Sequence, residues 1–395
     1  MNTVFSERIS DVPRSFIREI LKVTSDSSVI SFAGGLPNKE LFPAEELRQA
    51  ALKVFDTFGA DVLQYGNSEG HVGVRQMIAN RYRLRGLAVD TEDVLITNGS
   101  QQALDLLGKV LIDERDGLVI EEPGYLGAIQ AFSIFRPNFR PVRLTEEGMD
   151  IDALKSVLSC SPKMMYVVPN FQNPSGISYS LENRREVAAL IDGTSVLLVE
   201  DDPYGDLRYV GSPEPSFKLF VPDNTVLLGS FSKTVVPGFR LGWIVANSEI
   251  MERLIIAKQA ADLHTNQLTQ YILYQYLTDN DLDAHIRRIQ SAYGTQLATM
   301  LAAIEDQFPE NVWHTHPQGG MFVWAGLPGQ SSSRDLLQLS MRDKVVFVPG
   351  DPFYISRGEV NTMRLNFTCA DKETIDEGIR RLGKAIRNLC GLATA

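Results

Sequence analysis

The sequence predicts an α/β fold: a large domain with a mostly parallel central sheet flanked by helices, and a smaller α+β C-terminal domain. Short apolar, β-branched runs alternate with amphipathic helical stretches between residues 93 and 247, which is typical of βαβ units. From about residue 250 the alternation gives way to long helical segments, followed by strands and helices in mixed order. The length of 395 residues also exceeds the ~150 residues of an average domain, so more than one domain is expected.

The elements predicted for the large domain follow one another regularly. Strands are expected where Val, Ile and Leu dominate short runs, at 93–97, 117–122, 141–145, 164–170, 196–202, 225–231 and 241–247. Helices are expected between them, at 101–112, 124–134, 150–158 and 181–193. Because parallel sheets place their sites beyond the carboxyl ends of the strands, the chemistry is expected just after each run.

The two ends of the chain differ from this pattern. Helices are expected up to about residue 307, at 332–342 and at 371–390, with strands at 321–327, 344–350 and 361–367. The first residues contain one short helical stretch, 14–22, and a Gly/Pro-rich segment, 32–43, which together are expected to form an arm. We therefore expect an N-terminal arm and substrate-covering segment at 1–45, a large domain at 46–284 and a small domain at 285–395.

Composition excludes several classes of protein. The formal net charge is −11, opposite in sign to that of a protein that binds a phosphate backbone, so no nucleic acid partner is expected. Cys160, Cys369 and Cys390 lie far apart, without the spacing of a disulfide framework or a zinc site, which favours a reducing cytosol. The sequence shows neither a secretory apolar region nor an apolar stretch of ~18 residues, so no membrane partner is expected. A cytoplasmic protein without a metal is expected.

The first candidate site follows the strand that ends at Thr97. Gly99 and Ser100 open a helix there, and the N–H groups of its first turn have no partners within the helix. A glycine for close approach, a hydroxyl and a helix N-terminus can bind an anion. An ordinary helix cap uses the same residue types, so this motif alone leaves both interpretations open.

Two carboxylates, Asp201 and Asp202, follow a strand made almost entirely of Val and Leu. A carboxylate at a buried strand end needs a cationic partner, because its desolvation is otherwise costly. The pair could instead cap a helix or bind a metal. A metal is disfavoured because none of the five histidines accompanies these aspartates in sequence.

Lys233 is the most informative residue. It lies between Ser232 and Thr234, and Arg240 follows seven positions later. A lysine in a loop is usually a solvated charge. Ser230 and Lys233 also match the S-x-x-K motif of penicillin-binding enzymes, but the S-D-N and K-T-G motifs that accompany it do not occur. In a third interpretation, the lysine forms a Schiff base with an aldehyde cofactor whose phosphate is held by the hydroxyls and the arginine.

Eight blocks, in order along nearly the whole chain, carry a resemblance to a known family. They are FAGGLPNKELFP, LQYGNSEGHVGVRQ, NGSQQALDL, EEPGY, PNFQNPSG, EDDPYGDLRY, SFSKTVVPGFRLGW and MRLNF. The set resembles the pyridoxal-phosphate aminotransferases of fold type I (class I/II), within them the branch of α-aminoadipate, kynurenine and broad-range aminotransferases. NPSG replaces the more usual NPTG. The resemblance implies ping-pong transfer of an amino group between an aromatic, long aliphatic or 2-aminoadipate-like L-amino acid and 2-oxoglutarate.

The resemblance also implies which residues would hold the ring of pyridoxal 5'-phosphate. Lys233 would bind the cofactor covalently and then serve as acid and base. Asp201 would pair with the pyridine nitrogen and keep it protonated. Tyr204 and Asn173 would hydrogen-bond the phenolic oxygen of the ring, and Tyr125 would stack on its face.

Further residues would hold the phosphate and the substrate. Arg364 would bind the substrate carboxylate together with Asn173, since the planar arginine fork suits two parallel hydrogen bonds. Gly35 would line the substrate pocket, and Tyr65 would reach the phosphate of the neighbouring subunit in a homodimer with shared active sites. Arg18 matches an arm position that meets a distal carboxylate, although two arginines four positions apart are often only solvated. The phosphate would be held by Ser100, Gln101, Ser230, Ser232 and Arg240.

Three alternatives stand beside the aminotransferase. A β-eliminating lyase or a decarboxylase would use the same cofactor, because substrate orientation helps to choose the bond that breaks. A serine acyl-transfer enzyme would use S-x-x-K, and a non-catalytic binding protein is disfavoured because every position of the family set is filled. The branch also supplies effector domains of GntR-type regulators. Fewer than ~35 residues precede FAGG, too few for a winged helix, so a regulator is not expected.

Overall fold

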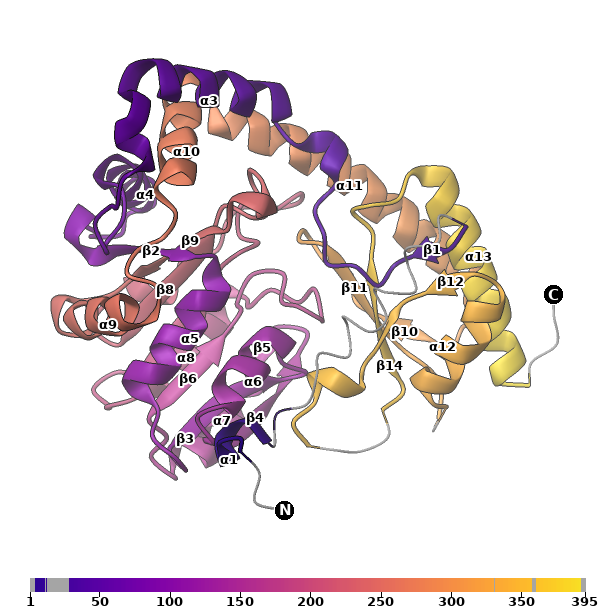
Figure 1. The fold of residues 1–395 in the computed structure, drawn as a ribbon. Coiled ribbons are helices and arrows are strands. Elements are labelled where there is room, and N and C mark those ends of the chain that lie inside the picture. The colour runs from indigo at the N-terminus through magenta and orange to yellow at the C-terminus, as the bar shows by residue number, and fades with distance from the viewer. Residues whose placement is uncertain (1–3, 11, 13–27, 330, 357–359, 392–395) are drawn as a thin grey trace.

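The computed structural model describes residues 4–10, 12, 28–329, 331–356 and 360–391. Its centre is an eight-stranded sheet with the order β2-β9-β8-β7-β6-β3-β4-β5 (Figure 1). Strands β8, β7, β6, β3 and β4 run parallel to their neighbours in this series, whereas β9 is antiparallel to both neighbours and β5 is antiparallel to β4. In sheet order the strands are β2 (Val94–Asn98), β9 (Leu241–Val245), β8 (Thr225–Ser230), β7 (Leu197–Asp201), β6 (Met164–Val167), β3 (Gly117–Glu122), β4 (Asn138–Thr145) and β5 (Gly148–Met149).

Helices cover both faces of this sheet. Alternate residues of one strand enter different cores: Leu118 and Ile120 pack on the side of α5 and α6, and Val119 packs on the side of α7 and α8. Burial on both faces explains why these strands appear in the sequence as unbroken apolar runs. The helices are α5 (Ser100–Leu111), α6 (Leu126–Ser133), α7 (Ile151–Leu158), α8 (Leu181–Ile191) and α9 (Ser248–Ala261).

A second, four-stranded antiparallel sheet has the order β10-β11-β14-β13. The long helix α11 (Leu282–Gln307) leads to it and packs against α13 (Lys372–Leu389). In α13 the buried residues Ile375, Ile379, Leu382 and Ile386 recur every three or four positions, which places them on one face. The other elements here are β10 (Trp313–His314), β11 (Phe322–Gly326), α12 (Ser333–Arg342), β12 (Val345–Val346), β13 (Val348–Pro349) and β14 (Thr362–Asn366).

One segment joins the two bodies. The short strand β1 (Ile30–Ser31) pairs in parallel with β12, and the chain then crosses to α3 (Ala44–Phe58), above the large sheet (Figure 1). The helices α1 (Glu7–Ser10), α4 (Val72–Leu84) and α10 (Gln267–Asp279) complete the fold. The 3-10 helices are η1 (Lys39–Leu41), η2 (Gly59–Leu63), η3 (Thr91–Asp93), η4 (Phe217–Leu219), η5 (Pro237–Phe239) and η6 (Asp351–Phe353).

The predicted fold class is confirmed, with differences in detail. The run 344–350, expected as one strand, is divided at Phe347: β12 pairs with β1, and β13 pairs with β14. The short strands β1, β5 and β10 were not predicted, because two residues are too few to show a period. The helix expected at 14–22 lies outside the described residues. No helix in the described ranges is long and apolar enough to cross a membrane.

Candidate active site

Three chain segments meet where the central strands end. Ser230 closes β8 and is paired in register with Gly242 of β9. Gly242 in turn lies under the start of α5, since a Cβ there would come within 2.6 Å of the Ser100 nitrogen. The end of β8 and the N-terminus of α5 are therefore neighbours, although they are far apart in sequence.

This corner carries positive charge. Gly99 adopts a left-handed φ of 72°, and a Cβ there would lie 2.6 Å from Nη2 of Arg240. The guanidinium thus lies against the backbone at the positive end of α5, so glycine is required at this position both for conformation and for space. Nearby, the Ser232 N–H donates to Ser230 Oγ at 3.1 Å. A helix N-terminus, an arginine and hydroxyls together favour an anion.

Tyr125 lies beside this corner, just before α6. Its ring lies over Gly127, where a Cβ would be 2.5 Å from the ring. Gln101 Nε2 donates to the Gly127 carbonyl at 2.9 Å, which ties the start of α5 to this turn. Burial, with a smaller contribution from the Asp201 charge, raises the pKa of Tyr125 to about 12, so its phenol is neutral at physiological pH.

Asp201 is the buried acid of the site. Only 1% of its surface is exposed, and Oδ2 accepts a hydrogen bond of 2.6 Å from the hydroxyl of Tyr166. The other oxygen, Oδ1, has no partner among the described residues. Burial raises the pKa of Asp201 to about 7, while the Tyr166 hydrogen bond opposes the rise. Tyr166 was missed in the sequence analysis; its phenol within the apolar strand 164–170 was the available signal, since a buried tyrosine needs a partner.

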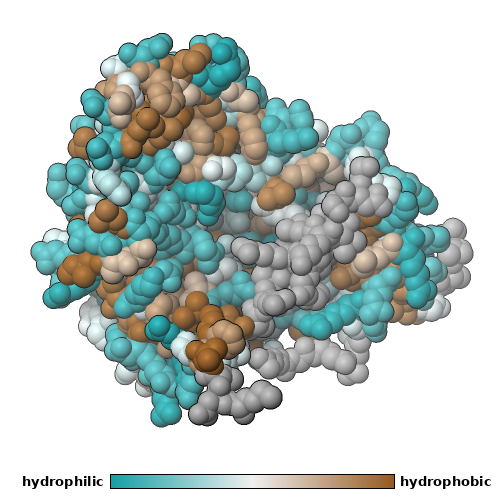
Figure 2. All heavy atoms as spheres, viewed as in Figure 1, coloured by the Kyte–Doolittle hydropathy of each residue, from teal (hydrophilic) through white to brown (hydrophobic). Residues whose placement is uncertain are grey.

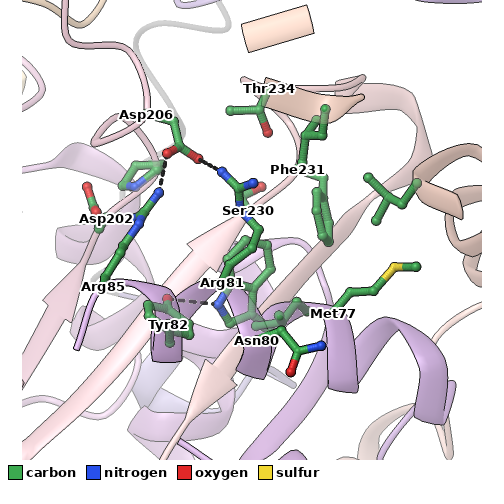
Figure 3. A pocket seen from close by; sticks show the side chains of 15 residues that line it. Met77, Asn80, Arg81, Tyr82, Arg85, Asp202, Asp206, Ser230, Phe231 and Thr234 are labelled. Carbon is green, nitrogen blue, oxygen red and sulfur yellow. Dashed lines mark hydrogen bonds and ion pairs between the residues drawn. The ribbon is translucent and has the colours of Figure 1, made fainter. Parts of the chain in front are cut away.

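Asp202 has a different environment. Its Oδ1 accepts from Asn170 Nδ2 at 2.9 Å and from the Gly205 N–H at 2.8 Å. It lines a cavity of about 220 Å³ together with Arg85 and Asp206 (Figure 3). Neither Asp201 nor Lys233 lines this cavity. The two adjacent aspartates therefore have different hydrogen-bond partners and face different parts of the molecule.

Lys233 follows β8 and approaches the segment that joins the two bodies. Its Nζ donates to the carbonyl of Gly35 at 2.9 Å. Burial, followed by the positive charges of Arg364 and Arg240, lowers the pKa of Lys233 to about 8, and nearby Cys369 opposes the change. An amine with this pKa is available in both protonation states near neutral pH.

Arg364 lies in β14 of the second sheet, with 2% of its surface exposed. Nη1 donates to Asn173 Oδ1 at 2.8 Å, and Nη2 donates to the Ala33 carbonyl at 2.7 Å. The guanidinium carbon is 4.4 Å from the ring centroid of Phe322, and Nε has no partner within the described chain. Burial lowers the pKa of Arg364 to about 10, which still leaves it charged at neutral pH.

Tyr204 is buried between these groups. Its ring meets the ring of Phe322 edge-on at a centroid distance of 6.0 Å. Burial raises the pKa of Tyr204, and the Tyr125 and Asp201 charges raise it further, while Arg364 opposes them. Phe322 and the Ala33 carbonyl were not predicted as site groups, and Gly35 was predicted to line the substrate pocket but not to accept from Lys233 through its carbonyl. A main-chain acceptor leaves no residue-specific signal in a sequence.

One predicted site residue in the described ranges, Tyr65, is not brought to this cluster within a single chain. Tyr65 is 78% exposed, and its ring meets the ring of His264 edge-on at 5.7 Å. No contact between Tyr65 and Lys233 or Arg240 is found within the described residues. Arg18 lies outside the described residues.

The charges of the cluster fit pyridoxal phosphate. The unpartnered Oδ1 of Asp201 is suited to a protonated ring nitrogen, and the α5 N-terminus with Arg240 is suited to a phosphate. Lys233, with a lowered pKa, supplies the amine that an aldehyde requires. A negative end, a positive end and an amine are thus provided by separate elements.

Comparisons with known proteins agree with this geometry. The model of the family "Aminotransferase class I and II" matches residues 28–382. Aromatic-amino-acid aminotransferase 1 of Thermococcus litoralis is 41% identical over 391 residues, covering 97% of this chain and 94% of that protein.

Two solved structures are similar along their whole length. The kynurenine aminotransferase of Pyrococcus horikoshii, in complex with PMP, has a TM-score of 0.93 and 39% identity, covering 98% of this chain and 97% of that one. The alpha-aminoadipate aminotransferase of Thermus thermophilus, complexed with N-(5'-phosphopyridoxyl)-L-leucine, has a TM-score of 0.92 and 39% identity, covering 98% of each chain. The chain therefore belongs to the class I and II aminotransferases, the pyridoxal-phosphate enzymes of fold type I that its motifs resemble.

Proposed function

We propose that this aminotransferase moves the amino group of an aromatic, long aliphatic or 2-aminoadipate-like L-amino acid to 2-oxoglutarate in a ping-pong cycle. The observation that carries the proposal is the buried Arg364, which presents its fork beside Lys233 and is held by Asn173. Such a fork binds the carboxylate that every amino acid and 2-oxo acid shares. The substrates named for the relatives from Thermococcus, Pyrococcus and Thermus support the donor class.

The residues predicted for cofactor binding have compatible surroundings. When bound, pyridoxal phosphate supplies a ring that accepts the negative charge developing at the substrate Cα. Asp201 would hold the ring nitrogen through its unpartnered Oδ1, Tyr204 and Asn173 would hold the ring oxygen, and Tyr125 would cover the ring face. The phosphate would be held by Ser100, Gln101, Ser230, Ser232 and Arg240.

Lys233 performs the proton transfer in this proposal. Its Nζ takes a proton from the substrate Cα and later returns one, which suits a group whose pKa lies near the working pH. The S-x-x-K alternative gains no support, because Ser230 Oγ donates to the Leu241 carbonyl, although at 3.4 Å, and Lys233 donates to the Gly35 carbonyl.

A homodimer with shared active sites is part of the proposal. Apolar side chains gather at the surface over α3 and α10 (Figure 2). Leu52, Phe55 and Phe58 of α3 are 49%, 43% and 37% exposed, and Leu63 and Tyr65 follow directly with 66% and 78%. A surface of this kind favours a protein partner. If a second copy of the chain packs against this surface, Tyr65 of each copy would reach the phosphate in the active site of the other.

Several other predictions remain part of the proposal. The chain divides into an arm at 1–45, a large domain at 46–284 and a small domain at 285–395, with the last boundary in the first turn of α11. Gly35 lines the substrate pocket, and its Cβ position lies 3.3 Å from the ring of Phe322. Arg18, outside the described residues, reads a distal carboxylate. The enzyme works in the cytoplasm.

The amino-group transfer can be measured directly. With 2-oxoglutarate as acceptor, aromatic, long aliphatic and 2-aminoadipate donors are expected to yield glutamate, quantified by a coupled assay. Lys233→Ala should lower kcat by at least about 10²–10⁴-fold, the usual contribution of one acid/base group. Ammonia or carbon dioxide released without glutamate would instead identify a lyase or a decarboxylase.

The pKa of Lys233 predicts a pH profile. Covalent capture of pyridoxal phosphate by the apo-protein needs the neutral amine, so its rate should rise through about pH 8. Arg364→Gln removes a positive charge that lowers this pKa, so the midpoint should move to higher pH. Borohydride trapping and peptide mapping follow the reaction, with the surface variant Arg48→Gln as control. A midpoint that is the same in all three proteins contradicts the assignment.

Replacement of the two aspartates should have unequal effects. Asp201→Asn removes the charge that keeps the ring nitrogen protonated, and kcat should fall by about 10²-fold or more, since breaking a buried ion pair costs about 3–5 kcal/mol. Asp202→Asn should cause a smaller loss, because that side chain lines a cavity that neither Asp201 nor Lys233 lines and is bonded to Asn170 and Gly205 instead. Steady-state kinetics with cofactor absorbance spectra distinguish the two variants. Equal losses would show that the wrong aspartate was chosen.

Hybrid dimers test the shared site. Tyr65→Phe subunits mixed with Lys233→Ala subunits should form one site with both changes and one with neither. Turnover should therefore reappear in the hybrid, although Lys233→Ala homodimers are inactive and Tyr65→Phe homodimers are weakened. Differently tagged subunits allow the hybrid to be isolated and assayed. A confirmed hybrid without any site of wild-type activity would place Tyr65 in its own subunit.

A further inference from the structure

Glu121 is a buried carboxylate for which the family resemblance implies no task. It is the penultimate residue of β3 and is 0% exposed. Its Oε1 accepts from the Val168 N–H at 2.9 Å and from the Tyr179 hydroxyl at 2.8 Å, and its Oε2 accepts from Gln172 Nε2 at 3.0 Å. All three donors belong to the connection between β6 and α8. No ion pair of Glu121 is found among the residues described.

Gln172 links Glu121 to the turn that follows it. Its Nε2 also donates to the Pro123 carbonyl at 2.7 Å, so both acceptors hold the amide in one orientation. Its Oε1 then accepts from the Ser175 N–H at 2.9 Å and from the Ser175 hydroxyl at 2.6 Å. The main-chain bonds Gln172 N–H to Ile177 O (2.8 Å) and Gly176 N–H to Gln172 O (2.6 Å) close the turn.

The turn held in this way carries Asn173, whose Oδ1 accepts from Arg364 Nη1 at 2.8 Å. A continuous path therefore runs from Glu121 through Gln172 and Asn173 to Arg364. Burying an ionised carboxylate without a cation is costly, and the three donors offset only part of that cost. Burial accordingly raises the pKa of Glu121 to about 7, although all three hydrogen bonds oppose the rise. A glutamine at this position would keep its oxygen toward the two donors on the Oε1 side, the Val168 N–H and the Tyr179 hydroxyl, and would therefore present its NH2 group to the Gln172 NH2 group. The carboxylate is thus matched to these three donors.

We propose that Glu121 is a positioning residue: acting through Gln172, it fixes the turn that carries Asn173 and thereby orients Arg364 for the substrate carboxylate. The inference rests on the proposed function of Arg364 and Asn173. A residue that only supports the fold would respond alike to loss of either contact. For Glu121 we expect loss of the Gln172 contact to affect substrate binding and loss of the Tyr179 contact to affect only stability.

The test compares Glu121→Gln with Tyr179→Phe, which removes a different donor and leaves the Gln172 contact intact. In Glu121→Gln, KM for donor and acceptor should rise by about tenfold, as for one hydrogen bond to a charged group, while kcat changes less. In the apo-protein, hydrogen exchange at the Ser175 and Gly176 amides should become faster. In Tyr179→Phe, the thermal midpoint should fall, while KM and the exchange of these two amides stay as in wild type.

A charge swap adds a rescue. Gln172→Glu alone places two carboxylates 3.0 Å apart, whereas Glu121→Gln with Gln172→Glu restores a donor facing an acceptor. The double variant should have a lower KM than Gln172→Glu alone, with incomplete recovery because residue 172 then loses its donor to the Pro123 carbonyl. Additive effects, unchanged Ser175 exchange in Glu121→Gln, or equal KM increases in Glu121→Gln and Tyr179→Phe would each overturn the proposal. Arg364→Lys with unaltered KM would refute the proposed function of Arg364, whereas the exchange data would still judge the Glu121–Gln172 link.

Discussion

The end of β7 buries a carboxylate whose negative charge is not balanced by a positive group among the described residues. Asp201 has one donor, Tyr166, and one oxygen without a partner in the described chain, at an exposure of 1%. Water cannot compensate an acid that is this deeply buried, so the charged form is disfavoured until a cation arrives. The positive groups of the site, Lys233, Arg240 and Arg364, come from other strands and turns. The site is thus built for a molecule that carries the missing opposite charges itself.

The fold could be predicted well because its strands are buried on both faces. The runs that became β3, β7, β8 and β9 needed no alternation, and the observed bounds differ from those expected by two residues or fewer. What escaped prediction depends on long-range pairing. The stretch 344–350 is apolar throughout, but its first half pairs with β1 and its second half with β14, more than ten residues further along the chain. No local pattern records which edge is available to a short strand.

The candidate site could be predicted where side chains carry the chemistry. The motif blocks predict Lys233, Asp201, Arg240 and Arg364 as site residues, and the structure places them on elements that converge, while their roles stay predictions. The sequence does not predict groups that act through the main chain or that act on the site through another residue. The Ala33 carbonyl that accepts from Arg364 has no residue signature, and nothing in the sequence distinguishes Glu121, with its three donors, from the other residues of its strand. Tyr65 is a different case, because its expected partner belongs to a second subunit.

The segment between β1 and α3 touches both key cations by its carbonyls, Gly35 to Lys233 and Ala33 to Arg364. A carbonyl bears only a partial charge, so in the proposed function a substrate carboxylate would replace the Ala33 carbonyl at Arg364 with a gain in electrostatic energy. Because main-chain carbonyls make these two contacts, the side chains of this segment need not be charged. In the proposed function, in which Gly35 lines the substrate pocket, variation in this segment would change the shape of the pocket and leave Lys233 and Arg364 unchanged. Differences in donor preference among relatives should accordingly lie in the backbone path and side-chain size of the segment between β1 and α3. Lys233 and Arg364 should not differ.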